Sequence, residues 1–167
     1  MSEKLVKRSD KIAFFGVLGV DDSYVYTRMT GFTDMSVSKN PKEYARQYVD
    51  EAFEQTDVAG YSPSIGYGFD QYDGNTVHED IVKIADDELV GSQAVRPIII
   101  VNLTKEGTPD DSFLAVRRDF AVIPDSEGHS TDAYTYSGNF KVKGEKIKGT
   151  AISTDDWQTV TFTETVV

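Results

Sequence analysis

The residues whose types suggest chemistry most directly are His78 and Glu79. They match the first two positions of HExxH, in which two histidines one helical turn apart bind zinc and the glutamate acts as general base. Val82 occupies the position of the second histidine, so the motif is incomplete. The other histidine, His129, lies in a polar stretch without a partner at ligand spacing, and the chain has no cysteine. Because structural zinc sites draw their four ligands mainly from Cys and His, we expect no zinc site.

Nucleophilic and acid–base chemistry also lacks a suitable pattern. Ser64, Gly66 and Gly68 form neither a nucleophile elbow nor a phosphate-binding loop, because no glycine loop leads into a helix. Paired carboxylates occur, such as Asp86-Asp87, Asp110-Asp111 and Asp155-Asp156. Each pair falls at an expected helix end or turn, where acids are usually solvated, whereas a glycosidase needs two carboxylates that face each other across a cleft. We therefore expect no enzyme, no cofactor and no metal.

Length and hydropathy indicate a single globular domain. The chain has 167 residues, enough to bury one core without disulfides. Its longest apolar run, 98–101, suits a strand and is far too short to span a membrane. The N-terminal sequence MSEKLVKRSD lacks the apolar segment of a secretory signal. We therefore expect synthesis in the cytoplasm and no membrane partner.

Charge is distributed unevenly along the chain, whose net charge is −11. Residues 61–100 contain two basic residues, Lys83 and Arg96, against seven acidic ones. One interpretation is an ordinary soluble acidic surface, and the other is a surface that must not hold a polyanion. Stable DNA binding needs a basic footprint, and the only candidates are Arg117-Arg118 and the lysines of 141–148. A domain that reads nucleic-acid sequence is therefore not expected.

Most of the chain has the short apolar runs of β-strands, separated by turn residues. The expected strands are 11–18, 23–29, 64–72, 97–103, 113–123, 134–142, 146–152 and 157–164. The run 97–103 is apolar almost throughout, which predicts a strand covered on both faces. Gly66 and Gly68 predict close approach by another backbone, and the cluster 124–128 is expected to end the strand before it. The pattern predicts a mainly β fold, either a sandwich or a barrel.

One segment, 76–88, has helical periodicity instead. Val77, Ile81 and Ile84 recur at the spacing of one helix face, which is expected to pack on the sheets. Thr76 and Glu79 fit a capping box, in which both side chains accept hydrogen bonds from free backbone N–H groups at the helix start. A glycine at position 91 is expected to stop the helix.

The segment that follows residue 33 has few large apolar residues and many charges. Asn40-Pro41 favours a turn near its middle, and strand alternation would place Tyr44, Arg46 and Tyr48 on one face. Neither face is apolar enough for the chain's own core, and a charged two-stranded ribbon is marginal by itself in water. We therefore expect a projecting hairpin or loop over 36–57 that something outside the subunit orders, which indicates assembly. A solvated helix over 42–55 is the alternative, since good helix formers occur there.

Five segments carry a resemblance to a known family: YTRMTGFTDMSVSKNPKEYARQYVDEAFEQTDVAGYSPSIGYGFDQY (24–72), VHEDIVKIADDE (77–88), FAVIPDSEG (120–128), DAYTYSGNFKVKGE (132–145) and WQTVTFTE (157–164). In this order they resemble the major tail proteins, or tail tube proteins, of long-tailed bacteriophages that infect Gram-positive bacteria. The resemblance covers nearly the whole chain. It rests on the sum of the segments, because no single motif is chemically diagnostic.

The resemblance implies a β-sandwich or barrel-like tail-tube fold, with 1–167 as one domain and one flanking helix. It implies a structural virion protein whose hexameric rings stack into the tail tube, the conduit for DNA delivery into the host. The implied partners are further copies of itself, the tape measure protein, and the tail terminator and distal tail proteins. DNA would only pass through, without specific binding. The implied location is the phage tail, after assembly in the host cytoplasm.

Within this family an N-terminal arm, 1–10, and the hairpin 36–57 would join the subunits. The expected interface residues are Lys4, Lys7, Arg8, Lys39, Asn40, Pro41, Lys42, Tyr44, Arg46 and Tyr48. A net acidic channel wall is also expected, because basic residues are scarce over 61–100. The candidates for this wall are Asp70, Asp73, Asp110, Asp111, Asp155 and Asp156. The opposite outcome is a basic wall lined by Lys141, Lys143, Lys146 and Lys148.

A carbohydrate-binding β-sandwich is the alternative from another class of function. Its aromatic faces for sugar stacking would come from Tyr24, Tyr26, Tyr72, Tyr134, Tyr136 and Trp157. The alternation of Tyr134 and Tyr136 along one strand favours burial of both in the core instead. A hydrolase that uses paired carboxylates is the third hypothesis.

Overall fold

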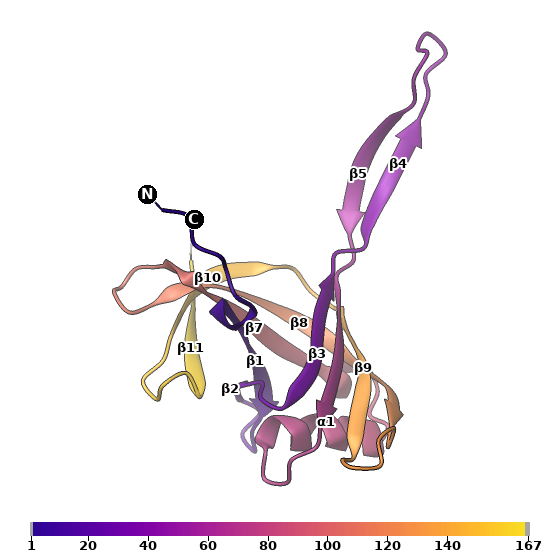
Figure 1. The fold of residues 1–167 in the computed structure, drawn as a ribbon. Coiled ribbons are helices and arrows are strands. Elements are labelled where there is room, and N and C mark those ends of the chain that lie inside the picture. The colour runs from indigo at the N-terminus through magenta and orange to yellow at the C-terminus, as the bar shows by residue number, and fades with distance from the viewer. Residues whose placement is uncertain (1, 166–167) are drawn as a thin grey trace.

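The computed structural model describes residues 2–165, which form eleven β-strands and one α-helix (Figure 1). In chain order these are β1 (Lys11–Leu18), β2 (Tyr24–Arg28), β3 (Phe32–Ser38), β4 (Pro41–Arg46), β5 (Gln55–Tyr61), β6 (Ser64–Asp70), α1 (Thr76–Asp86), β7 (Val95–Glu106), β8 (Phe113–Glu127), β9 (Thr135–Val142), β10 (Ile147–Ile152) and β11 (Thr159–Glu164). Short 3-10 turns, Arg8–Asp10 and Gly91–Ala94, precede β1 and β7. The predicted arm 1–10 and domain 1–167 include Met1, Val166 and Val167, which lie outside the described residues.

Nine strands form one antiparallel sheet in the order β10-β11-β2-β1-β7-β8-β9-β6-β3. β10 also pairs with β8, and this pairing closes β8, β10, β11, β2, β1 and β7 into a six-stranded barrel. β8 then leaves the barrel: its residues 113–117 pair with β10, whereas its residues 120–127 pair with β9. We call the second half of β8 together with β9, β6 and β3 the wing. The prediction of a mainly β, barrel-like fold with one helix is confirmed.

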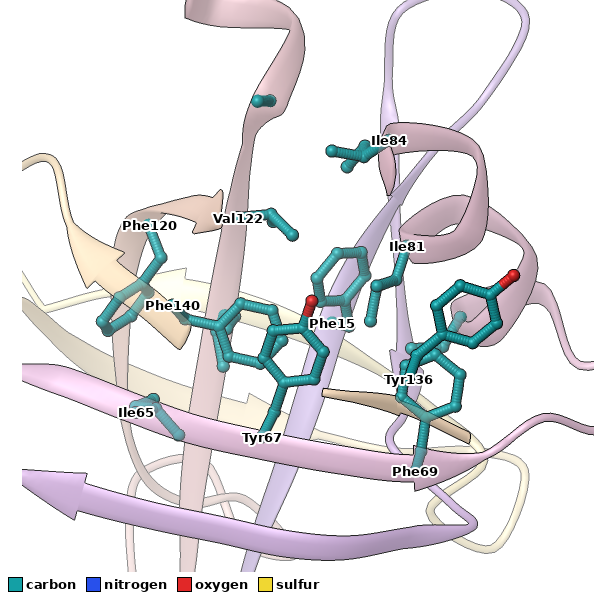
Figure 2. Packing of buried hydrophobic residues seen from close by; sticks show 13 residues of the cluster. Phe15, Ile65, Tyr67, Phe69, Ile81, Ile84, Phe120, Val122, Tyr136 and Phe140 are labelled. Atoms are coloured by element: carbon teal, nitrogen blue, oxygen red, sulfur yellow. The ribbon is translucent and has the colours of Figure 1, made fainter. Parts of the chain in front are cut away.

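Two apolar cores form because the central strands β1 and β7 bury both of their faces. Phe14 and Ile99 pack inside the barrel, whereas Phe15 and Ile98 pack on the opposite face, between the wing and α1. Figure 2 shows this second core, in which the Phe140 ring lies against Phe15 and stacks on Tyr67. The prediction that the run 97–103 is covered on both faces is therefore confirmed.

α1 covers the wing core with the predicted face, since Val77, Ile81 and Ile84 are each 1% exposed or less. The predicted capping box is wrong, because the N-cap residue is Asn75 and Thr76 is the first helical residue. The Asn75 side-chain oxygen accepts hydrogen bonds from two backbone N–H groups of the first turn.

The end of α1 also differs from the prediction. The helix stops at Asp86, and Glu88 adopts a left-handed conformation with φ of 49°. The N–H groups of Glu88 and Leu89 bond to the carbonyls of Ala85 and Ile84, which is the Schellman pattern. Gly91, expected to stop the helix, begins the next 3-10 turn instead.

Two predictions about wing backbone are wrong. β8 continues through Pro124 to Glu127, because a bulge between Pro124 and Ser126 accommodates the proline within the strand. Gly66 and Gly68 are not closely approached by another backbone. That close approach occurs at Gly138, where a Cβ would collide with the carbonyl oxygen of Ile123.

Candidate assembly surfaces

β4 and β5 form a separate two-stranded hairpin that stands away from the body of the molecule (Figure 1). The hairpin follows directly from β3 and β6, which pair with each other as far as Ser38 and Ser64. From residue 36 to residue 59, every residue except Glu51 is exposed. The two strands pair from Pro41–Tyr61 to Arg46–Gln55 and bury no side chain. The hairpin therefore has surface on all sides and no core of its own.

The hairpin differs from the prediction in its turn and its bounds. Residues 47–54 connect the strands, so Asn40-Pro41 lies at the base and not in the turn. Asn40 has φ of 47°, and its amide donates hydrogen bonds of 3.1 Å to the Ser62 carbonyl and the Ser64 hydroxyl. Residues 36–38 belong to β3, so the projecting part is 39–62. The alternative of a helix over 42–55 is wrong.

The predicted interface residues gather on the hairpin and near its base. The hairpin set, Lys39, Asn40, Pro41, Lys42, Tyr44, Arg46 and Tyr48, is exposed throughout, as are Lys4, Lys7 and Arg8 of the arm. The arm lies near the hairpin base, because the Arg8 guanidinium donates to the Lys11 carbonyl at 2.7 Å and to the Met35 carbonyl of β3 at 3.4 Å. Tyr44 and Arg46 share a face, with the guanidinium carbon 5.5 Å from the ring centroid. Their contact with another subunit stays a prediction.

In the part of the chain that the structure describes, the wing has two open strand edges, one along β3 and one along the second half of β8. β3 pairs with β6 only, so the backbone groups along its other edge have no partner strand. Residues 122–127 of β8 pair with β9, whereas the pairing of β8 with β7 ends at Ala121. Such edges are templates for strand addition by another chain.

The wing has one polar face, on the side opposite its core. The register places Ser36, Gly66 and Asn139 side by side across β3, β6 and β9. A Cβ built on Gly66 would meet only Asp34 and Asn139, its neighbours in the same sheet, so no other element covers it. We call this surface the polar wing face. Sequence reasoning missed it, although the alternation in SIGYGFD and TYSGNFK carries the signal.

The six predicted wall acids fall into two groups. The β6 group is Asp70 and Asp73, and the turn group is Asp110, Asp111, Asp155 and Asp156, in the β7–β8 and β10–β11 connections. These groups lie toward opposite ends of β8. The β10–β11 connection follows the pairing of β10 with the start of β8. The end of β6 lies beside the start of β9, which in turn pairs with the end of β8. Of the six, Asp70 is the one on the polar wing face, opposite Thr135. Whether any of them lines a channel stays a prediction.

Asp155 has a local role in its turn. Its carboxylate accepts hydrogen bonds from the Thr159 hydroxyl at 2.6 Å, the Thr159 N–H at 2.9 Å and the Ser153 hydroxyl at 2.8 Å. These bonds, the one from the Thr159 hydroxyl first, lower the pKa of Asp155 to about 2. Asp156 and Trp157 follow with positive φ, so Asp155 holds a tight connection between β10 and β11.

His78 is fully buried and has a structural environment. Its Nδ1 accepts a hydrogen bond from the Tyr72 N–H at 3.1 Å, and its Nε2–H donates to the Thr30 carbonyl at 2.7 Å. The ring stacks on Phe69 with centroids 4.3 Å apart. Burial lowers the pKa of His78, and this outweighs the hydrogen bond to Thr30, so the ring is neutral at pH 7. The described residues hold no group of three or more His, Cys, Asp or Glu that could bind a metal.

Sequence reasoning missed a buried ion pair between α1 and the start of β7. The Arg96 Nε lies 2.8 Å from Asp80 Oδ2, and the two side chains are 4% and 9% exposed. Arg96 Nη1 also donates to the carbonyls of Gln93 and Val95 at 2.9 Å. The available signal was the presence of Arg96 as one of two cations in a strongly acidic stretch.

The aromatic residues do not form one sugar-stacking platform. Tyr26 and Trp157 pack against the barrel core, and Tyr136 is buried in the wing core. Tyr24, Tyr72 and Tyr134 are exposed, so the expectation that Tyr134 would be buried with Tyr136 is wrong. The Tyr134 hydroxyl donates to Glu127 at 2.7 Å.

Comparisons with known proteins show a shared fold. No family model and no curated protein matches the chain. A chain in the virion of a native gene transfer agent particle superposes with a TM-score of 0.59 at 15% identity, over 85% of this chain and 97% of that one. A chain in the tail of an empty gene transfer agent particle, refined with C6 symmetry, gives the same values. No helix in residues 2–165 is long and apolar enough to cross a membrane.

Proposed function

We propose that this protein is the subunit of a tail tube, in which six copies form a ring and stacked rings form a hollow conduit for DNA. The observation that carries the proposal is the hairpin 39–62, which projects from the body and buries no side chain. Because a charged two-stranded ribbon is marginal by itself in water, contacts with other copies would stabilise it. The fold shared with a chain of a tail refined with C6 symmetry supports a six-membered ring.

Within a ring, the open edge of β3 would pair with residues 122–127 of β8 in the next copy. The two edges lie on opposite sides of the wing, so repeated pairing would join the wings of all copies into one closed sheet. Closure removes both open edges, which a separate subunit leaves exposed to aggregation.

The polar wing face would then line the channel, because the opposite face of the same strands packs on the body. Its side chains on β3, β6 and β9 are mostly small and uncharged, with Asp34, Asp70 and Lys141 as the charged members. Such a wall offers a polyanion little to bind, and its charges act only over about 8 Å at physiological salt. DNA would therefore slide past without being held.

The remaining partners follow from the resemblance to tail tube proteins. They are the tape measure protein, the tail terminator and the distal tail proteins. The particle would be the tail of a long-tailed phage of a Gram-positive host, or a phage-derived particle, assembled in the host cytoplasm.

Electron microscopy of the purified protein tests the proposal. Hollow tubes of regular diameter with six-fold symmetry are the expected result. Uniform monomers at high protein concentration would count against a tube subunit and would reopen the carbohydrate-binding alternative.

DNA binding by the assembled tube tests the channel wall separately. We expect negligible affinity for duplex DNA at every salt concentration. Tight binding that weakens steeply with salt would instead indicate a basic wall, with Lys141, Lys143, Lys146 and Lys148 as its candidates.

A further inference from the structure

A groove opens between β3 and the neighbouring strands β1 and β7, near the base of the hairpin. Its floor is apolar and consists mainly of Ala13, Met35, Val37 and Ile100, with Val6 of the arm at one side. The groove has a volume of about 520 Å³, enough for an aromatic side chain together with an aliphatic one. A narrower extension of about 80 Å³ continues from Val37 into the wing.

The charged residues that line the groove and its extension are all basic. Lys7, Arg8 and Lys11 line the groove, and Lys39, Arg118 and Lys146 line the extension. The one ion pair among the described residues is Arg96–Asp80, so none of these six cations lies within 4 Å of a carboxylate. The groove thus combines an apolar floor with unpaired positive charge.

The hairpin turn has the complementary composition. Val49 and Phe53 are 108% and 82% exposed, the latter an aromatic residue without any packing partner in its subunit. Asp50, Glu51 and Glu54 lie beside them, and residues 47–55 contain no lysine or arginine. The turn therefore has apolar side chains and unpaired negative charge together.

One copy cannot satisfy both surfaces itself. The six residues of β4 separate Asn40 at the hairpin base from the turn that begins at residue 47, a distance of about 20 Å at the usual rise per residue. The hairpin runs away from the body, so its turn points away from the groove at its own base (Figure 1). Any contact between turn and groove must join two copies, and because it uses two different surfaces it generates either a closed ring or an open-ended series; between stacked rings it gives the open-ended series.

We propose that the hairpin turn of one copy binds in this groove of a copy in the next ring. Phe53 and Val49 lie on the apolar floor, and the acids of the turn face the basic residues around it. The inference rests on the proposed function, because it names the surface that receives the inter-ring hairpin. It also makes stacking directional, since every ring has turns on one side and free grooves for the ring before it.

Disulfide trapping tests the contact directly, because the chain has no cysteine of its own. The variant Phe53→Cys with Val37→Cys is assembled under reducing conditions and then oxidised. We expect a ladder of covalently linked copies on a denaturing gel. The matched control, Phe53→Cys with Val20→Cys, combines the same turn cysteine with a still more exposed position in the β1–β2 turn and should give no ladder.

A charge exchange provides a second measurement that does not depend on oxidation. Asp50→Lys with Glu54→Lys should raise the protein concentration needed for tube formation at least about tenfold, as loss of a central interface contact does. Adding Lys7→Glu and Lys39→Glu to the same chain should restore most of the loss. All four positions are exposed, so the fold should not change.

The outcomes separate this inference from the proposed function. If the wild-type protein forms no tubes, the proposed function fails. If tubes form but oxidation gives no ladder and the charge exchange gives no rescue, the tube stands and the groove is not the acceptor. If a Leu5→Cys, Val37→Cys monomer closes an internal disulfide while the turn never links, the groove belongs to the chain's own arm and the inference is overturned.

Discussion

The wing and the hairpin are both built from strands whose side chains alternate between two faces, but only the wing strands bury one of those faces. In β6, Ile65, Tyr67 and Phe69 are buried while the residues between them are glycines. In β4, a strand of similar length, all six residues are exposed and charges occur on both faces. The first pattern builds a core and the second builds only surface. If the hairpin joins copies as proposed, stability of the subunit and its capacity to assemble reside in separate segments, which can be changed one at a time.

The largest expected effect comes from removing the hairpin. Replacing residues 41–61 with Asn-Gly should abolish tube formation, while the free energy of unfolding changes by less than about 1 kcal/mol, because the removed residues bury no side chain. Electron microscopy and urea unfolding measure the two quantities. Loss of cooperative unfolding in this variant would show that the hairpin belongs to the folding core.

The reverse effect is expected for a change in the body. Ile81→Asp should destabilise the subunit by about 3–5 kcal/mol, because it buries an unpaired charge at a fully buried position. Phe53→Asp in the exposed turn is the matched control and should change the unfolding free energy by no more than about 0.5 kcal/mol. Equal effects in urea unfolding would contradict the separation of the two segments.

The ion pair between α1 and β7 should have a somewhat smaller effect. Arg96→Met leaves Asp80 buried without its partner, and we expect a loss of about 3 kcal/mol in urea unfolding. The double variant Arg96→Met with Asp80→Leu should recover most of this loss, because neither charge remains. No recovery would assign the effect to the Arg96 hydrogen bonds with the Gln93 and Val95 carbonyls.

The smallest expected effect is a pH dependence within the body. The folded state lowers the pKa of His78, so the unfolded chain binds the proton more readily. The contribution to stability is complete above the unfolded pKa of about 6.5 and is lost as pH falls below it. Unfolding free energy should thus decrease from about pH 7 to about pH 5, and His78→Gln should flatten this slope. An equal slope in the wild type and in His78→Gln would contradict this assignment.

The sequence predicts those features of the fold that depend on the residues of a single strand or helix. The bounds of β1 and the two-sided burial of β7 follow from uninterrupted apolar runs, and the apolar face of α1 follows from the spacing of Val77, Ile81 and Ile84. The pairing of β8 with β10 could not be read, because it depends on which distant strand completes the barrel. A strand bending from one pairing to another leaves no periodic signal.

The candidate surfaces were predictable in a similar, partial way. Scarcity of apolar residues correctly predicts that the hairpin projects, but the turn predicted at Asn40-Pro41 is wrong, because residues 47–54 connect the strands. Asn40 instead has its positive φ at the base of the hairpin, where β3 is followed by β4. The ion pair of Arg96 with Asp80 joins residues of two elements, so spacing along the chain could not reveal it.

The path of β8 has a mechanical consequence for a tube built as proposed. One uninterrupted backbone of fifteen residues belongs both to the channel wall and to the outer barrel. A load on the wall passes into the barrel through covalent bonds, so the two layers of a subunit cannot slide past each other. Bending of the tube must then occur at the contacts between subunits. Each subunit moves as a rigid body, so the diameter of the channel stays constant.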